Sequence, residues 1–266
     1  MIRLLATALV LLALAGCGGG GGEPAGTTAV APPVSHFTLY YLDGEHLQSV
    51  PAELPSAGPT PAEAVEALLA NADGHPTEIP PETELLGMVV VDRTATVDLS
   101  RDFESGGGSA SMQARVAQVV YTLTEWSFVG RVTVELDGEP VEAIGGEGVP
   151  ARELTRADFE SVLPPIFIDP PLDWASPPLN VAGSASVFEA NVSFRLEANG
   201  ETLAEGFTTA AEGAPGRGAF SALLDFDVDG PTDATLVAFE VSAADASETN
   251  VVRVPVRLCP PGNLPC

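Results

Sequence analysis

Short runs of β-branched, aromatic or alternating apolar residues recur through the first part of the chain, which is the pattern of β-strands. Five such runs predict strands, at residues 36–42, 47–50, 86–91, 94–99 and 131–136. The turn Asp43-Gly44 separates the first strand from the second, and Asp92-Arg93 is expected to join the third to the fourth as a hairpin.

Two segments have helical periodicity instead. The first begins at Pro61, where Thr60 and Glu63 predict a capping box, and it ends at residues 71–74. The second is expected over residues 109–126. Apolar residues lie on one face of each: Val65, Leu68 and Leu69 in the first, and Met112, Val116, Val119, Val120 and Leu123 in the second. This order of elements predicts an α+β domain over residues 35–160, with two helices covering one face of a mostly antiparallel or mixed sheet.

The second part of the chain, residues 164–258, shows no helical period. Pro164-Pro165 and Pro170-Pro171 mark a stiff boundary before it, because proline disfavours helix in the residue that precedes it. Six or seven short strands are expected between Gly, Asn and Asp turns, in the runs 179–185, 190–198, 202–209, 219–226, 234–242 and 250–258. This spacing is typical of an all-β sandwich.

Residues 1–16 have the pattern of a secretory signal, in which one cation precedes an apolar run too short to span a bilayer. Leu14-Ala15-Gly16-Cys17 then matches the lipobox of bacterial lipoproteins, so Cys17 is expected to carry a lipid that anchors the chain in the membrane. A plain secretory signal with an incidental cysteine and an uncleaved helix are the alternatives. Residues 17–34, rich in Gly and Pro, are expected to form a tether.

Charge limits the partners that the chain can have. Its 266 residues include 37 Asp and Glu against 11 cationic residues, all arginine, for a formal net charge of −26. Such a surface repels phosphate backbones and anionic headgroups, which excludes nucleic acid and a polybasic membrane patch.

One segment resembles a cation site. Asp225-Phe226-Asp227-Val228-Asp229-Gly230 looks like the start of an EF-hand loop, but its twelfth position, which should supply a carboxylate, is Leu236. A solvated strand face is therefore expected, with weak cation binding as the alternative. His36, His46 and His75 lack the spacing of metal ligands. Neither a metal nor a cofactor is expected.

Catalytic motifs are also weak. The sequence has no Gly-x-Ser-x-Gly elbow and no lysine for a phosphate loop, and the Gly/Ser loop at 105–111 is expected to be a flexible connector, with anion docking at the following helix as the alternative. Acids on predicted strands are expected to face solvent: Asp98, Glu135, Glu197, Asp225 and Asp227. Because 37 acids offer many accidental pairs, a hydrolase with paired carboxylates stays the enzyme alternative.

Cys259 and Cys266 bound the C-terminal tail, residues 259–266. With Cys17 lipidated, they are the remaining thiols in an oxidising compartment, and the Pro/Gly sequence between them can turn. A disulfide is expected, and two free thiols or pairing with another protein are the alternatives.

Several runs of the first domain resemble the GerMN domain, the sporulation and germination domain of bacterial envelope lipoproteins: residues 38–43, 96–100, 118–125 and 134–138. Tyr121-Thr122-Leu123-Thr124-Glu125 is the most specific of these motifs. The chain departs from the family where Ala70-Asn71-Ala72 replaces a common Gly-Pro, and in a shortened segment before Ile79-Pro80.

The second domain is similar to the immunoglobulin-like domain found beside bacterial germination modules, in residues 176–179, 181–185, 187–190 and 236–242. Ala246 stands where a Gly often follows the Asp at 245. The resemblance implies a non-catalytic lipoprotein on the extracytoplasmic face of the membrane, which binds an envelope protein or cell-wall component in sporulation, germination or wall upkeep. A modulator of an envelope sensor kinase and a peptidoglycan hydrolase are the alternatives, and a solute-binding lipoprotein is a more remote one.

Overall fold

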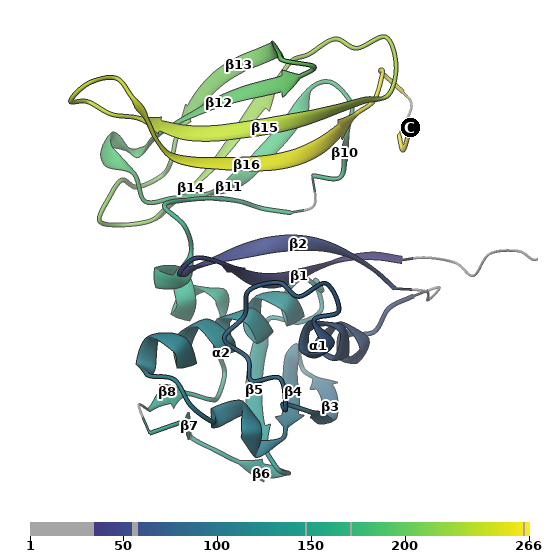
Figure 1. Cartoon of the computed structure of the whole chain (residues 1–266), viewed down its shortest axis with the longest axis vertical. Coiled ribbons are helices and arrows are strands. Elements are labelled where there is room, and N and C mark those ends of the chain that lie inside the picture. Colours follow the sequence, from purple (N-terminus) through teal and green to yellow (C-terminus); the bar gives the residue numbers. More distant parts are fainter. Residues whose placement is uncertain (1–34, 55–57, 147, 171, 263) are drawn as a thin grey trace, which may run out of the picture. The chain divides into compact units, whose positions relative to one another are not determined.

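The computed structural model of the chain describes residues 35–54, 58–146, 148–170, 172–262 and 264–266 (Figure 1). The signal segment, the lipobox and the tether at residues 1–34 lie outside the described residues. In the described part, no helix has both the length and the apolar character needed to span a bilayer.

Most strands of the first domain form two sheets, and two further short strands pair with each other in a third. β1 (Ser35–Asp43) and β2 (His46–Leu54) pair antiparallel as a ribbon of their own. The larger sheet is mixed, as predicted, and has the order β3-β4-β5-β6, with β4 parallel to β5. Its strands are β3 (Leu85–Val91), β4 (Thr94–Leu99), β5 (Arg131–Leu136) and β6 (Glu139–Pro140). The sequence pattern indicates which face of a strand is buried but not its partner, so the separation of β1 and β2 was not foreseen.

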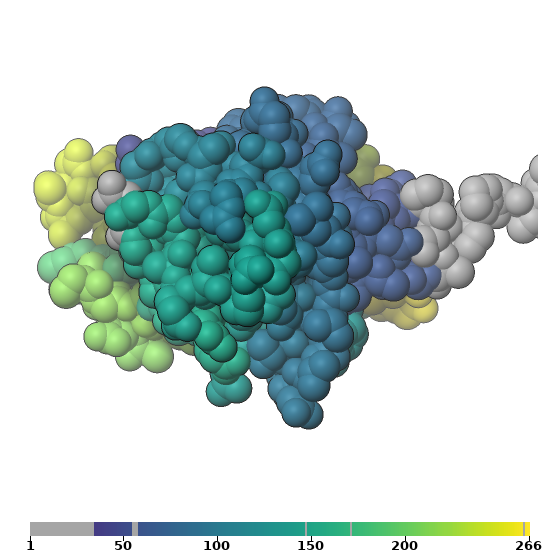
Figure 2. All heavy atoms as spheres, turned by 90° about the horizontal axis from the view of Figure 1, so that it is seen from below, coloured from purple at the N-terminus to yellow at the C-terminus, as the bar shows by residue number. Residues whose placement is uncertain are grey.

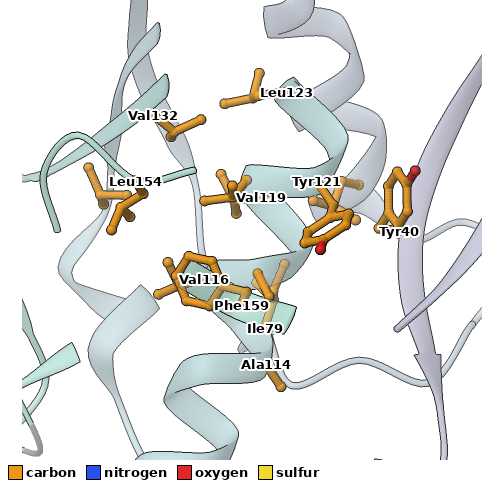
Figure 3. Close-up of a cluster of buried hydrophobic side chains, with 14 of the residues drawn as sticks. Tyr40, Ile79, Ala114, Val116, Val119, Tyr121, Leu123, Val132, Leu154 and Phe159 are labelled. Atoms are coloured by element: carbon orange, nitrogen blue, oxygen red, sulfur yellow. The ribbon is translucent and has the colours of Figure 1, made fainter. Parts of the chain in front are cut away.

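Two helices lie between the ribbon and the larger sheet, and α2 contacts both (Figure 1). α1 (Pro61–Ala70) begins as predicted, because Thr60 Oγ1 accepts from Glu63 N at 3.2 Å and Glu63 Oε2 accepts from Thr60 N at 2.7 Å. α2 (Ser109–Leu123) ends three residues before the predicted limit. Their apolar faces fill the first core, part of which is drawn in Figure 3.

Short elements complete this domain, and the sequence pattern did not reveal them. They are η1 (Arg101–Glu104), β7 (Ala143–Ile144), β8 (Val149–Pro150) and η2 (Arg156–Val162), where η is a 3₁₀ helix. None is long enough to show a period of its own.

The second domain is a sandwich of a five-stranded sheet, β10-β16-β15-β12-β13, and a three-stranded sheet, β14-β11-β9. The strands are β9 (Ile166–Ile168), β10 (Trp174–Ala175), β11 (Leu179–Ala185), β12 (Asn191–Ala198), β13 (Glu201–Thr209), β14 (Gly218–Leu224), β15 (Thr232–Val241) and β16 (Glu248–Leu258), and η3 (Phe188–Ala190) precedes β12. In β12, Val192, Phe194 and Leu196 are buried as expected.

β9 lies between the two proline pairs that were expected to mark only a boundary. Its three residues are all buried, and they alternate between two cores. Ile166 and Ile168 belong to the core of the sandwich, whereas Phe167 belongs to the core of the first domain. The ring of Phe167 lies 6.4 Å from that of Tyr40 and 6.2 Å from that of Tyr121, measured between centroids.

Candidate functional site

The motif at residues 121–125 lies at the C-terminal end of α2. Thr122 Oγ1 accepts a hydrogen bond from the backbone N–H of Tyr40 at 3.2 Å, and Leu123 is fully buried. Thr124 Oγ1 donates to the carbonyl of Val120 at 2.7 Å, and the backbone N–H of Thr124 donates to the same carbonyl at 3.0 Å. The helix thereby fixes β1 and places Glu125 just beyond its own end.

Arg156, the first residue of η2, crosses this helix end. Its Nε donates to Thr124 Oγ1 at 2.7 Å and its Nη2 to the carbonyl of Tyr121 at 3.2 Å. Nη2 also forms an ion pair with Glu125. The guanidinium carbon lies 4.8 Å from the centroid of the Tyr121 ring and 5.5 Å from that of Tyr40. A cation at this position is also favoured by the negative end of the helix dipole.

Tyr40 completes the group, which we call the Arg156 cluster: Tyr40, Tyr121, Thr124, Glu125 and Arg156. The Tyr40 hydroxyl donates to Glu125 Oε1 at 2.7 Å. Burial raises the pKa of Tyr40 far above its usual value, and burial raises the pKa of Tyr121 to about 12 although Arg156 opposes it. Burial would lower the pKa of Arg156, but Tyr40 and Glu125 outweigh it, so the net change is upward. At neutral pH the cluster therefore holds neutral tyrosines around a charged arginine.

These bonds make the Arg156 cluster a structural tie between β1, α2 and η2. The residues of the most specific sequence motif, 121–125, thus make their contacts within the chain. Sequence analysis missed Arg156 because nothing in the spacing links it to Glu125. The one available signal was the pair Thr155 and Asp158, whose capping box begins η2.

Asp169 follows β9 and adds a carboxylate close to the cluster. Burial raises its pKa; Arg156 lowers it in part and Glu125 raises it further. The side chain keeps access to solvent, because Asp169 lines a cavity of about 500 Å³ together with Thr38 and Gln48. Sequence analysis did not single out Asp169.

The Gly/Ser loop before α2 is tied down by Arg115, whose side chain is buried. Arg115 Nη1 donates to the carbonyls of Phe103 and Ser105 at 2.6 and 3.0 Å, and Nη2 donates to the carbonyl of Gly106 at 3.2 Å. Nη2 also donates to Ser111 Oγ at 3.0 Å. The loop is thus held more firmly than the expected flexible connector, and both terminal nitrogens of the guanidinium are used within the chain.

The segment that resembles an EF-hand loop lies beyond the end of β14, which stops at Leu224. Its three Asp residues are exposed, while Phe226 and Val228 pack on the sandwich core. The predicted alternation of burial is present, but in a loop and not in a strand.

The three histidines of the first domain have different contacts. His36 Nδ1 is 3.5 Å from Glu53 Oε1, and His75 stacks on Tyr41 with ring centroids 4.7 Å apart. His46 opposes Asp43 at the turn between β1 and β2. Among the residues that the structure describes, no three His, Cys, Asp or Glu side chains gather as metal ligands would.

The acids expected to face solvent differ in exposure. Asp225 and Asp227 are exposed, whereas Asp98, Glu135 and Glu197 are half-buried. Asp98 Oδ1 accepts from the backbone N–H of Gly138 at 2.8 Å, and Glu197 pairs with Arg195 at 2.5 Å. The face drawn in Figure 2, formed mostly by the first domain, shows no deep hollow.

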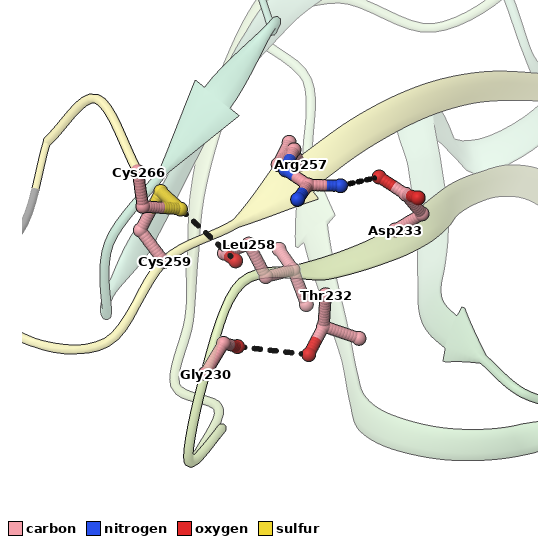
Figure 4. Close-up of a disulfide and its surroundings, with 7 residues drawn as sticks. All are labelled: Gly230, Thr232, Asp233, Arg257, Leu258, Cys259 and Cys266. Atoms are coloured by element: carbon pink, nitrogen blue, oxygen red, sulfur yellow. Dashed lines mark hydrogen bonds and ion pairs between the residues drawn. A yellow bond between two sulfur atoms is a disulfide. The ribbon is translucent and has the colours of Figure 1, made fainter.

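At the C-terminus, Cys259 and Cys266 form a disulfide with their Cα atoms 5.6 Å apart (Figure 4). Cys259 is fully buried, and its N–H donates to the carbonyl of Ala175 at 2.8 Å. The disulfide loop is therefore attached to β10. Cys17 lies outside the described residues.

Comparison with known families assigns both domains. A family described as "Sporulation and spore germination" matches residues 38–142, and an "Immunoglobulin-like domain of bacterial spore germination" matches residues 171–247. The chain has the domain architecture of a germination protein. No curated protein matches it. Arg156, β9 and Asp169 lie between the two matched ranges.

Solved structures give further similarities. The tandem GerMN domains of the sporulation protein GerM from Bacillus subtilis are 17% identical, covering 73% of this chain and 62% of that one, with a TM-score of 0.43. The first GerMN domain of GerM is 21% identical over 46% of this chain and 98% of that one, with a TM-score of 0.37. A structure described as a lipoprotein from Clostridium perfringens is 18% identical over 49% and 93%, with a TM-score of 0.35.

Proposed function

We propose that the chain is an extracytoplasmic lipoprotein, held on the membrane by a lipid on Cys17, whose two domains bind a component of the cell envelope without catalysing a reaction. The observation that carries this proposal is the order of segments: a lipobox, a Gly/Pro-rich tether, and then two germination domains. The two family matches support a role in sporulation or germination. The lipobox supports the anchor, because a lipid chain binds a membrane through its buried CH₂ groups.

Cell fractionation tests the anchor. Cys17→Ser is expected to leave the chain as an unprocessed precursor or to release it into the medium. Cys266→Ser, a matched change of another cysteine, is expected to stay in the membrane fraction. The anchor is disproved if the Cys17→Ser protein resists alkaline washing as firmly as the wild type.

The residues of the most specific motif bond to one another and to neighbouring elements, which gives the Arg156 cluster a structural role. Binding is tested by sedimenting insoluble peptidoglycan, and separately envelope extract, with the purified chain. Retention by either one supports the proposal. If the folded chain sediments with neither peptidoglycan nor envelope extract, the result is evidence against the proposal.

The hydrolase alternative has one supporting observation, which is the raised pKa of Asp169 at the edge of a cavity. A glycoside hydrolase needs one carboxylic acid that stays protonated and one carboxylate that stays ionised. We expect no soluble fragments to be released from purified peptidoglycan. Fragment release that disappears in Asp169→Asn, while the variant stays folded, would replace the binding proposal with an enzymatic one.

A further inference from the structure

β3 is an unprotected edge of the larger sheet of the first domain. Within the described residues it pairs only with β4. Its sequence, Leu-Leu-Gly-Met-Val-Val-Val, contains no charge and no proline. Exposed edges are templates for pairing with another chain, and proteins usually protect them with Lys, Pro or bulges. β3 has only a register shift between Leu85 and Gly87.

The two faces of β3 differ in what they contact. Leu85, Met88 and Val90 pack against the first core. On the other face, Leu86, Val89 and Val91 are 49%, 55% and 59% exposed. Three aliphatic side chains thus remain in water along a free edge, in a chain whose net charge is −26.

We infer that β3 pairs antiparallel with β3 of a second copy, which joins the two larger sheets into one. Residues directly opposite in an antiparallel pair share a face. Any register centred on a residue of the strand satisfies this rule, and we place the centre at Val89 because this sets Val91 opposite a glycine. Val89 then faces its own counterpart, Val90 faces Met88, and Val91 faces Gly87. Gly87 is on the exposed face, since it pairs with Asp98, and its missing side chain leaves room for Val91.

Charges at the two ends of β3 favour this orientation. Glu84 precedes the strand and Arg93 follows it, and neither forms an ion pair within the described part of the chain. Antiparallel pairing brings Arg93 of each copy to the end that carries Glu84 of the other. Asp92 beside Arg93 offsets part of this attraction, but parallel pairing would place Glu84, Asp92 and Arg93 each beside its own counterpart. Repulsion between the remaining charges of the two copies is screened beyond about 8 Å at physiological ionic strength.

Sedimentation velocity with residues 33–266, which form one compact unit, tests the association. Val89→Lys puts two like charges opposite each other at the centre of the pair, so the dimer dissociation constant is expected to rise at least about tenfold. The control is Leu223→Lys, on the edge strand β14, whose side chain is 68% exposed. The dissociation constant of this variant is expected to stay within about twofold of the wild type.

Cysteine cross-linking tests the register in the same unit, where the other two cysteines form the disulfide. Val89→Cys is expected to give a covalent dimer on mild oxidation, and Val91→Cys is not, because Val91 lies opposite Gly87. The inference is overturned if the wild type sediments as a monomer up to about 0.5 mM. Equal cross-linking of the two variants, or equal weakening by Leu223→Lys and Val89→Lys, would also overturn it.

Discussion

Arg156 combines three kinds of contact at one point of the first domain. It donates to the end of α2, pairs with Glu125, and lies over two aromatic rings. The Arg156 and Glu125 side chains are 32% and 20% exposed, so water screens their ion pair less than it screens a surface pair. Removing the guanidinium would leave the Glu125 carboxylate half-buried without its cation, which is the costly way to break such a pair.

Arg156→Met is therefore expected to lower the free energy of unfolding of the first domain by about 2–3 kcal/mol. Urea unfolding followed by the helical signal in far-UV circular dichroism measures this change, because both α-helices belong to that domain. Arg152→Met is the matched control. Arg152 pairs with Glu142 at the surface, with exposed fractions of 52% and 85%, so its loss is expected to cost about 0.5 kcal/mol or less. Equal losses in the two variants would show that the Arg156 cluster is not a structural tie.

The raised pKa of Asp169 makes the stability of the fold depend on pH. An acid whose pKa is higher in the folded chain stabilises the fold fully below its unfolded pKa, and this contribution is lost as the pH rises through the folded pKa. Asp169→Asn is thus expected to melt at a higher temperature than the wild type at pH 7. At about pH 3, where the wild-type carboxyl is protonated, the two should melt alike.

Melting curves of Asp169→Asn and the wild type at both pH values check this expectation. Asp229→Asn, at an exposed Asp of the loop after β14, controls for the loss of one negative charge. If Asp229→Asn stabilises the fold as much at pH 7, the gain comes from reducing the net charge of −26 and not from Asp169.

At the scale of elements, the sequence predicted the features that depend on neighbouring residues, such as helix starts, turns and strand limits. Thr60 and Glu63 located the start of α1, and Asp92-Arg93 forms the predicted turn, with positive φ values of 49° and 66°. Most strands of the sandwich lie within about two residues of their predicted limits, because inward and outward positions alternate clearly. Strand partners could not be predicted, since register and neighbour depend on the other strand as much as on the strand itself.

The candidate site was predictable only in part, for the same reason. The motif at 121–125 identified the end of α2, but Arg156, which supplies the cation, comes from a short 3₁₀ helix about thirty residues later. β9 was not predicted, because it has three residues and prolines lie on both sides of it. Its side chains pack against residues distant in sequence, which no local pattern records.

At the scale of the whole molecule, β9 sets where the domains can be separated. The domain limits predicted from the sequence suggest two fragments, residues 35–160 and 162–266, that would fold independently. The structure shows that a cut at 160 falls inside η2 and removes Val162, Leu163 and Phe167, which are buried in the first core. The fragment that begins at 162 keeps Ile166 and Ile168, which its own core needs. Separating the domains at this point is therefore expected to lower the stability of the first domain.

A first-domain fragment that extends to residue 170 is accordingly expected to melt at a higher temperature than the fragment 35–160. Deletion of large buried side chains costs about 2–5 kcal/mol each, so the shorter fragment is expected to be marginal. Thermal melts followed by circular dichroism compare the two. Phe167→Ala in the longer fragment is the control, because it removes the ring that packs on Tyr40 and Tyr121 and keeps the chain length. If the two wild-type fragments melt alike, or if Phe167→Ala changes nothing, the core of the first domain is complete without β9.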